Sequence, residues 1–102
     1  MYGLIGKMRA TPGRRDELLA ILQEGTAEMP GCRLYLLAID PTDPDALWIE
    51  EVWDSEAEHD ASLGIPAVQR AIERARPLIA AFGEQFVTEP IGGLGLSLEG
   101  GS

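Results

Sequence analysis

Glu51 and Trp53 have the chemistry and the spacing expected of a small reactive site. They are two positions apart in a segment that alternates as a β-strand does, so both side chains are expected on the same face. A carboxylate that lies beside an indole in an apolar pocket can act as a base near neutral pH. The alternative is a glutamate at a strand end that pairs with an arginine, above a tryptophan that belongs to the core. The residues themselves leave both interpretations open.

His59 is the only histidine in the chain and lies in the element that follows Glu51 and Trp53. Because imidazole titrates near physiological pH, His59 is a second candidate proton acceptor. It stands between Glu58 and Asp60, however, and a lone histidine in such a run is also typical of a solvent-facing helix surface. A metal site is not expected, because one histidine and one cysteine without ligand spacing do not form a binding set.

One phenol and several cations could orient a bound molecule. Arg33 and Tyr35 alternate within the apolar segment 32–39, which places them on one face of a predicted strand. The long predicted helix carries three more arginines, Arg70, Arg74 and Arg76. Each of these groups could bind an anionic or phenolic substituent, or could instead be a solvated partner for the many acidic residues.

The charge balance excludes several classes of partner. The 102 residues include 17 acidic and 8 basic side chains, which gives a formal net charge of -9. Proteins that bind nucleic acids or anionic membranes neutralise phosphates with lysine and arginine, so neither partner is expected. No stretch approaches the roughly 18 apolar residues of a membrane span, and no signal-like segment opens the chain, so we expect a cytoplasmic location. The single cysteine, Cys32, is expected to be a buried thiol.

The elements that must position these residues follow from the hydrophobic pattern. Alternating residues predict four strands, over residues 2–9, 32–39, 46–53 and 85–91. The short turn-forming link between the second and third strands predicts a hairpin.

Three helices are expected between these strands. The first covers about 13–27, where apolar residues recur at helical spacing. A capping box at 55–58 starts a short second helix. The third begins at Pro66, is kinked by Pro77 and is closed by Gly83.

The resulting order, β-α-β-β-α-α-β, predicts an α+β ferredoxin-like fold with a four-stranded antiparallel sheet and helices on one face. The other face carries apolar residues and has no helix to cover it, so a homodimer that packs sheet against sheet is expected. Residues 1–93 form the predicted domain. The glycine-rich tail, 94–102, either frays or lies as an extended arm on a neighbouring molecule.

The run of residues 49–63 resembles the central motif of the antibiotic biosynthesis monooxygenase domain family, in which a strand that ends in Glu-x-Trp leads into a short helix. The helix start at 12–19 and the Pro77-Leu78-Ile79 end of the long helix are also similar to small quinol monooxygenases of that group. The resemblance covers nearly the whole chain.

This resemblance implies a dimer that oxidises a small phenolic or quinol-type aromatic with molecular oxygen, without a metal or flavin cofactor. Trp53 matches the pocket tryptophan and Glu51 the acid before it. Glu51 or His59 would accept the proton, and Tyr35 or Arg33 would orient the substrate.

Two departures from the family pattern limit this transfer. Many members have a histidine further along the short helix, where this chain has Ser62. The haem-degrading branch uses an asparagine, and this chain has none, so that activity is not expected. Two other functions stay open: a non-catalytic dimer that binds a hydrophobic metabolite, and an isomerase or cyclase that needs only a base and a shaped cavity.

Overall fold

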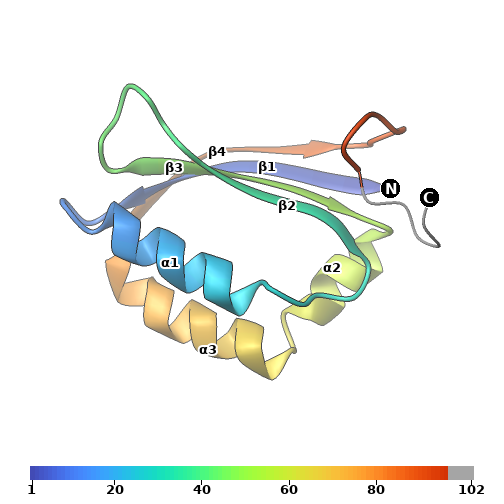
Figure 1. Cartoon of the computed structure of the whole chain (residues 1–102), viewed down its shortest axis with the longest axis horizontal. Helices are drawn as coiled ribbons and strands as arrows, with labels where there is room; N and C mark the ends of the chain where they lie inside the picture. The colour runs from blue at the N-terminus through green and yellow to red at the C-terminus, as the bar shows by residue number, and fades with distance from the viewer. Residues whose placement is uncertain (97–102) are drawn as a thin grey trace.

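Figure 1 shows the protein as a computed structural model in which helices cover one face of a sheet. The structure describes residues 1–96. The antiparallel sheet has the order β2-β3-β1-β4, with β1 (Tyr2–Ala10), β2 (Cys32–Ile39), β3 (Ala46–Trp53) and β4 (Ile79–Thr88). The helices are α1 (Arg15–Gly25), α2 (Glu56–Ser62) and α3 (Pro66–Ala75), and a 3-10 turn follows at Arg76–Leu78. The predicted element order and ferredoxin-like architecture are confirmed.

The register of the sheet decides which residues of β3 face the helices. β1 lies in the middle and pairs with both β3 and β4. Leu47 of β3 belongs to the core formed with α1 and α3, which identifies the helix-facing side. By alternation, the same side carries Ile49, Glu51 and Trp53, whereas Trp48, Glu50 and Val52 face away.

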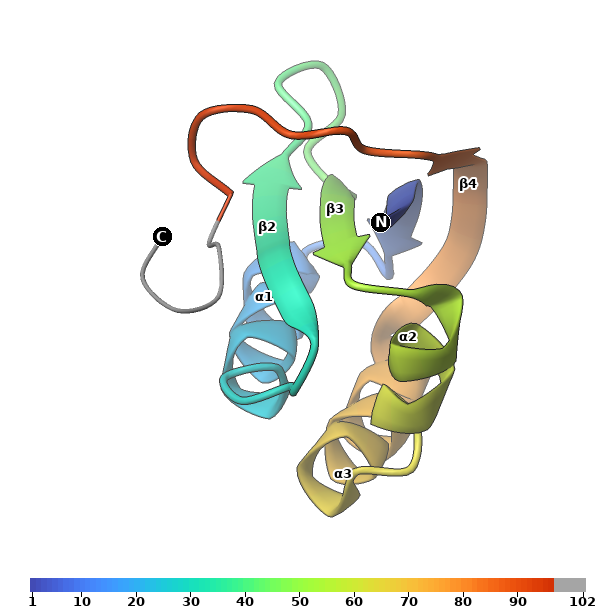
Figure 2. The same cartoon turned by 90° about the vertical axis from the view of Figure 1, so that its right-hand side faces the viewer.

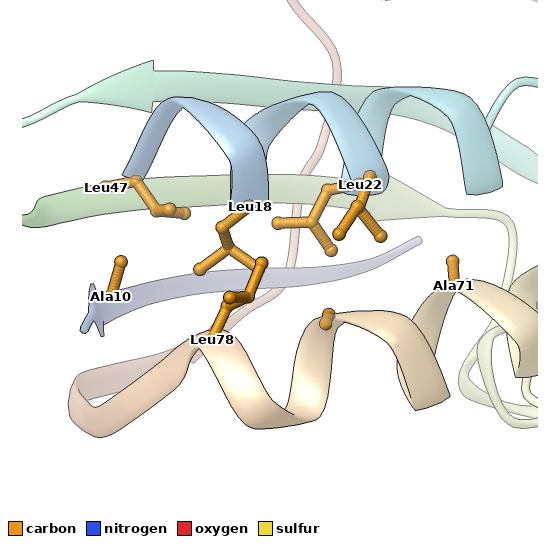
Figure 3. Packing of buried hydrophobic residues seen from close by; sticks show 8 residues of the cluster. Ala10, Leu18, Leu22, Leu47, Ala71 and Leu78 are labelled. Atoms are coloured by element: carbon orange, nitrogen blue, oxygen red, sulfur yellow. The ribbon is translucent and has the colours of Figure 1, made fainter. Parts of the chain in front are cut away.

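The hydrophobic core lies between this face and helices α1 and α3, as Figure 3 shows. Leu18 of α1 is fully buried there, and Leu22 lies one turn further along the same helix. At its C-terminal end α1 lies very close to α3: a Cβ on Gly25 would be 2.2 Å from the Cβ of Ala71. A larger residue at Gly25 would therefore push the two helices apart.

The predicted continuation of the last helix to Gly83 is wrong. α3 ends at Ala75 and the chain enters β4 after the 3-10 turn, so Gly83 lies within a strand. Pro77 has no N–H for a helical hydrogen bond and its ring clashes with the preceding turn, which favours the change to an extended strand. The misassignment arose because Ile79 and Phe82 are three positions apart, as on a helix face.

The first helix is also shorter than the predicted 13–27. It begins at Arg15, because Gly13 has a φ of 80° and leaves the right-handed helical path. None of the helices in residues 1–96 is long and apolar enough to cross a membrane.

The segment after β4, residues 89–96, crosses the face of the sheet opposite to the helices (Figure 2). A Cβ on Gly3 would be 3.0 Å from Pro90, so the segment contacts β1. Ile91 and Leu94 project from it and are fully exposed. The rest of the predicted tail, 97–102, lies outside the described residues.

Candidate active site

Glu51 and Trp53 lie at the end of β3 and point towards the helices. Trp53 Nε1 donates a hydrogen bond to Glu51 Oε1 at 2.9 Å. The indole is almost completely buried, with 1% of its surface exposed, while the Glu51 side chain is 17% exposed. Among the described residues no other group donates a hydrogen bond to the Glu51 carboxylate. This carboxylate therefore has free lone pairs.

His59 lies beside this pair because α2 begins directly after β3. Ser55 caps α2 by accepting a hydrogen bond from the Glu58 backbone N–H at 3.3 Å, which confirms Ser55 as the predicted N-cap residue. One turn later His59 Nε2 is 4.0 Å from Glu51 Oε1, and its ring packs edge-on to Trp53 with centroids 5.5 Å apart. The histidine thus faces the site instead of projecting into solvent.

The other ring nitrogen of His59 contacts a carboxylate of the same helix. Its Nδ1 is 3.1 Å from Asp60 Oδ1. The hydroxyl of Ser62, which is nearly buried, donates to the His59 carbonyl at 2.6 Å and so is tied to the helix backbone. Ser62 also borders the cavity described below, at the position where many members of the resembled family have a histidine.

Tyr2 is a neighbour of the site that the sequence reasoning missed. It pairs with Trp53 across the β1–β3 ladder, and its ring lies 5.6 Å from that of His59. Burial raises the pKa of its phenol, and the negative charges of Glu56, Asp60 and Glu51 raise it further. The available signal was its position at the start of the strand that pairs with β3.

Tyr35 lies directly opposite Glu51 in the β2–β3 ladder. Burial raises the pKa of its phenol strongly, and the charge of Glu51 adds to this effect. The hydroxyl is therefore protonated at neutral pH and is a potential hydrogen-bond donor at the site.

Arg33 does not share the site with Tyr35 as the simple alternation predicted. The register of β2 shifts between Cys32 and Leu34, so Cys32 is the residue opposite Trp53. Arg33, the extra residue in this shift, forms an ion pair with Asp54 and is not among the residues that border the cavity. A β-bulge of this kind breaks the two-residue period on which the prediction relied.

A cavity of about 120 Å³ lies beside Glu51 and Trp53, between β3 and the helices. His59 and Tyr35 border it, and apolar side chains, among them Leu22 of α1 and Val68, Ala71 and Ile72 of α3, form most of the remaining wall. A second cavity of about 330 Å³ adjoins it and shares Leu22 and Ile72 as lining residues. A third, of about 150 Å³, also borders Glu51. Within residues 1–96 no group of three or more acidic, histidine or cysteine side chains could hold a metal ion.

Comparison with known proteins identifies the family. The family model described as Antibiotic biosynthesis monooxygenase matches residues 1–74. A solved structure from Chloroflexus aurantiacus J-10-fl that bears this family's name is 62% identical, with a TM-score of 0.92. The alignment covers 94% of this chain and 98% of that one. No curated protein matches the chain.

More distant structures share the fold. One from Deinococcus radiodurans is 24% identical over 94% of this chain and 98% of its own, with a TM-score of 0.72. Another from Pseudomonas aeruginosa is 20% identical over 89% and 94%, with a TM-score of 0.76. Since the family model spans more than half of the residues, the chain belongs to the antibiotic biosynthesis monooxygenase family.

Proposed function

We propose that this protein uses molecular oxygen to oxidise a small phenolic or quinol-type aromatic, with no metal or flavin taking part. The observation that supports this proposal most is the environment of the Glu51 carboxylate. It borders a largely apolar cavity, accepts one hydrogen bond from Trp53 and has His59 4.0 Å away. A carboxylate with free lone pairs in such a cavity can accept a hydrogen bond or a proton from a bound phenol.

Glu51 and His59 can contact the same substrate hydroxyl. Because Glu51 Oε1 and His59 Nε2 are 4.0 Å apart, a substrate hydroxyl between them can share its single proton with both acceptors in a three-centre hydrogen bond. Asp60 contacts the other ring nitrogen, and a carboxylate there favours the tautomer with its proton on Nδ1. The free Nε2 then accepts the phenol proton, and the negative charge of Glu51 stabilises the imidazolium.

Removal of this proton prepares the substrate to react with oxygen. An electron-rich phenolate can transfer an electron to oxygen by itself, so the protein contributes orientation, deprotonation and exclusion of water. In the conversion of a phenol to a quinone, one oxygen atom of O₂ enters the ring. The other leaves as water together with the hydroxyl hydrogen and the displaced ring hydrogen.

Trp53 and Tyr35 supply the shape of the proposed site. The buried indole of Trp53 fixes one Glu51 oxygen and forms the wall against which an aromatic ring packs. Tyr35, protonated at neutral pH, would donate a hydrogen bond that orients the substrate. Arg33 is not assigned this role, because it pairs with Asp54 outside the cavity wall.

Oxygen uptake with a panel of hydroquinones and naphthalenediols tests the proposal. The purified protein should consume oxygen faster than the uncatalysed reaction, and labelled O₂ should place one labelled atom in the product. Glu51→Gln should lower the rate about a hundredfold, the size of a general acid–base contribution, because a neutral amide cannot stabilise the imidazolium that forms when His59 takes the proton. Glu73→Gln is the matched control, since Glu73 is exposed on α3 and borders none of the three cavities. A wild-type rate equal to autoxidation would contradict the proposal.

Binding without turnover is the second candidate function. The small number of polar groups that meet at the cavity favours it, because a site that only sequesters an apolar molecule needs no more. Such a protein would show a higher melting temperature with ligand and no oxygen uptake. Conversion of substrate with oxygen excluded would indicate an isomerase or cyclase instead.

A second copy of the chain is part of the proposal. Ile5, Leu36 and Phe86 align across β1, β2 and β4 on the face opposite to the helices. Leu36 and Phe86 are 48% and 52% exposed, and a second copy packed on this face would remove them from water. Sedimentation should show a dimer that Leu36→Glu dissociates. A monomeric wild type would contradict the dimer without affecting Glu51, which lies on the other face.

A further inference from the structure

Among residues 1–96, Arg76 is the one charged residue that borders the cavity of about 330 Å³ next to the candidate active site. It lies at the C-terminal end of α3, in the 3-10 turn that leads into β4. The rest of the lining is apolar: Met8, Leu22, Ile72, Ala75, Ile79 and Phe82. The Phe82 side chain at this cavity is 64% exposed, although it is a large hydrophobic group.

The Arg76 guanidinium has no carboxylate partner within residues 1–96, although the chain has 17 acidic and 8 basic residues. Lys7, Arg9, Arg14, Arg33 and Arg74 each form an ion pair, and Arg15 donates to backbone carbonyls. Within residues 1–96, Arg70 is the only other cation that has no carboxylate partner, and Arg70 does not border the cavity. A cation without a partner beside an exposed apolar hollow is therefore available to a ligand.

The cavity beside Arg76 adjoins the one that contains Glu51. Leu22 and Ile72 line both, and Figure 3 shows Leu22 projecting from α1 towards the sheet. Leu4 lies opposite Glu51, and Met8, which borders the Arg76 cavity, is four residues further along β1. At about 3.3 Å per residue, the position of Leu4 and the position of Met8 are about 13 Å apart along β1. This is roughly the length of two or three fused rings with a substituent.

We propose that Arg76 binds an acidic substituent at the end of the substrate remote from the reacting hydroxyl, so that the substrate class is a hydroxylated polycyclic aromatic acid. This inference rests on the proposed function, because it assumes that the phenolic end lies between Glu51 and His59. The aromatic rings would then cover the exposed side chains of Ile72 and Phe82.

A local cation is needed for such a substrate because the protein as a whole is acidic. The formal net charge of -9 repels anions at a distance, but salt screens this repulsion over about 10 Å at 0.1 M. Within the cavity the nearby guanidinium dominates, and its planar donors match a carboxylate well. Without Arg76, an acidic aromatic would lose its advantage in binding over its uncharged analogue.

Calorimetric binding of two matched probes under argon tests this inference without turnover. The probes are 2-naphthol and 6-hydroxy-2-naphthoic acid, which differ by one carboxylate on the ring remote from the hydroxyl. The wild type should bind the acid about fivefold more tightly than the naphthol, as expected of a partly exposed ion pair. Arg76→Gln should abolish this preference and leave naphthol binding unchanged. Arg70→Gln, the matched control on the same helix, should retain the preference.

The outcomes separate this inference from the proposed function. Equal affinity of the wild type for both probes, or an equal loss of preference in the Arg70 and Arg76 variants, overturns the role of Arg76 while the aromatic site stands. Failure of both probes to bind overturns the proposed function and this inference together. A melting temperature unchanged in both variants excludes a loss of fold as the cause of any difference.

Discussion

The two tryptophans of β3 each donate an indole N–H to a carboxylate, yet the two carboxylates differ in what else binds them. Trp48, which faces away from the helices, donates to Asp40 at 3.0 Å. Trp53, on the helix side, donates to Glu51 at 2.9 Å. Glu51 accepts no other hydrogen bond among the described residues and borders a cavity.

Asp40, in contrast, is saturated. It accepts hydrogen bonds from the backbone N–H and the hydroxyl of Thr42 at 2.8 and 2.7 Å, and Lys7 Nζ is 3.6 Å away. The Thr42 bonds, then the Trp48 bond and the charge of Lys7, hold the pKa of this carboxyl far below its usual range. A tryptophan–carboxylate pair is therefore no functional signal by itself. The lone pairs that remain free are what distinguish Glu51.

The largest expected effect is on stability, and it separates the two indoles. Trp53→Ala should lower the free energy of unfolding by about 3–5 kcal/mol, because the ring is 1% exposed and its removal leaves a cavity. Trp48→Ala should lower the free energy of unfolding by less, since that ring is only partly buried. Urea unfolding of both variants measures the difference, and equal losses would mean that the two ends of β3 are packed alike.

Replacement of His59 tests whether the Glu51 carboxylate needs the imidazole for activity. His59→Gln should lower the rate of oxygen uptake about a hundredfold, because it removes the nitrogen that we propose as the acceptor of the phenol proton. Glu58→Gln, one residue away, is the control and should retain the wild-type rate. If both variants retain it, Glu51 acts without the histidine.

Asp40→Asn tests the saturated carboxylate through its pH dependence. The folded-state pKa of Asp40 is lowered, so its contribution to stability is present above the unfolded pKa of about 3.9 and is lost as pH falls through the folded value. The variant should be less stable than the wild type at pH 7, and the difference should shrink at pH 2. A constant difference in urea midpoint across this range would show that the charge of Asp40 does not matter.

The smallest expected effect concerns Tyr35, beside the free carboxylate. Burial raises its folded-state pKa above the unfolded value of about 10, so the wild type should lose stability as pH rises beyond 10. Tyr35→Phe cannot ionise and should lose less stability between pH 9 and 11. If the urea midpoints of the two proteins fell equally between pH 9 and 11, water would have access to the ring beside Glu51.

Three strands of the sheet and the Glu51–Trp53 pair were predictable because they depend on local periodicity, whereas the fourth strand, predicted over 85–91, is β4 at Ile79–Thr88. The limits of β2 and β3 follow from alternation and from the turn that joins them, and the two-residue spacing puts both side chains on one face. The end of α3 was not predictable in this way, because Ile79 and Phe82 mimic a helix face although Pro77 precedes them.

The remaining site residues depend on contacts that the local pattern does not contain. The β-bulge moved Arg33 out of the site, since one extra residue reverses the alternation. His59 reached Glu51 only through the direction in which α2 leaves β3, and Tyr2 through the β1–β3 register. Whether a carboxylate is saturated depends on tertiary hydrogen bonds, so Asp40 and Glu51 cannot be told apart from sequence.

A crystal structure of the protein with 2-naphthol bound under argon tests most directly whether Glu51 is the open acceptor of the site. The proposed geometry predicts the naphthol hydroxyl within about 3.2 Å of both a Glu51 carboxylate oxygen and His59 Nε2, with the rings against Trp53. A naphthol bound with its hydroxyl turned to solvent, or bound outside this cavity, would contradict it.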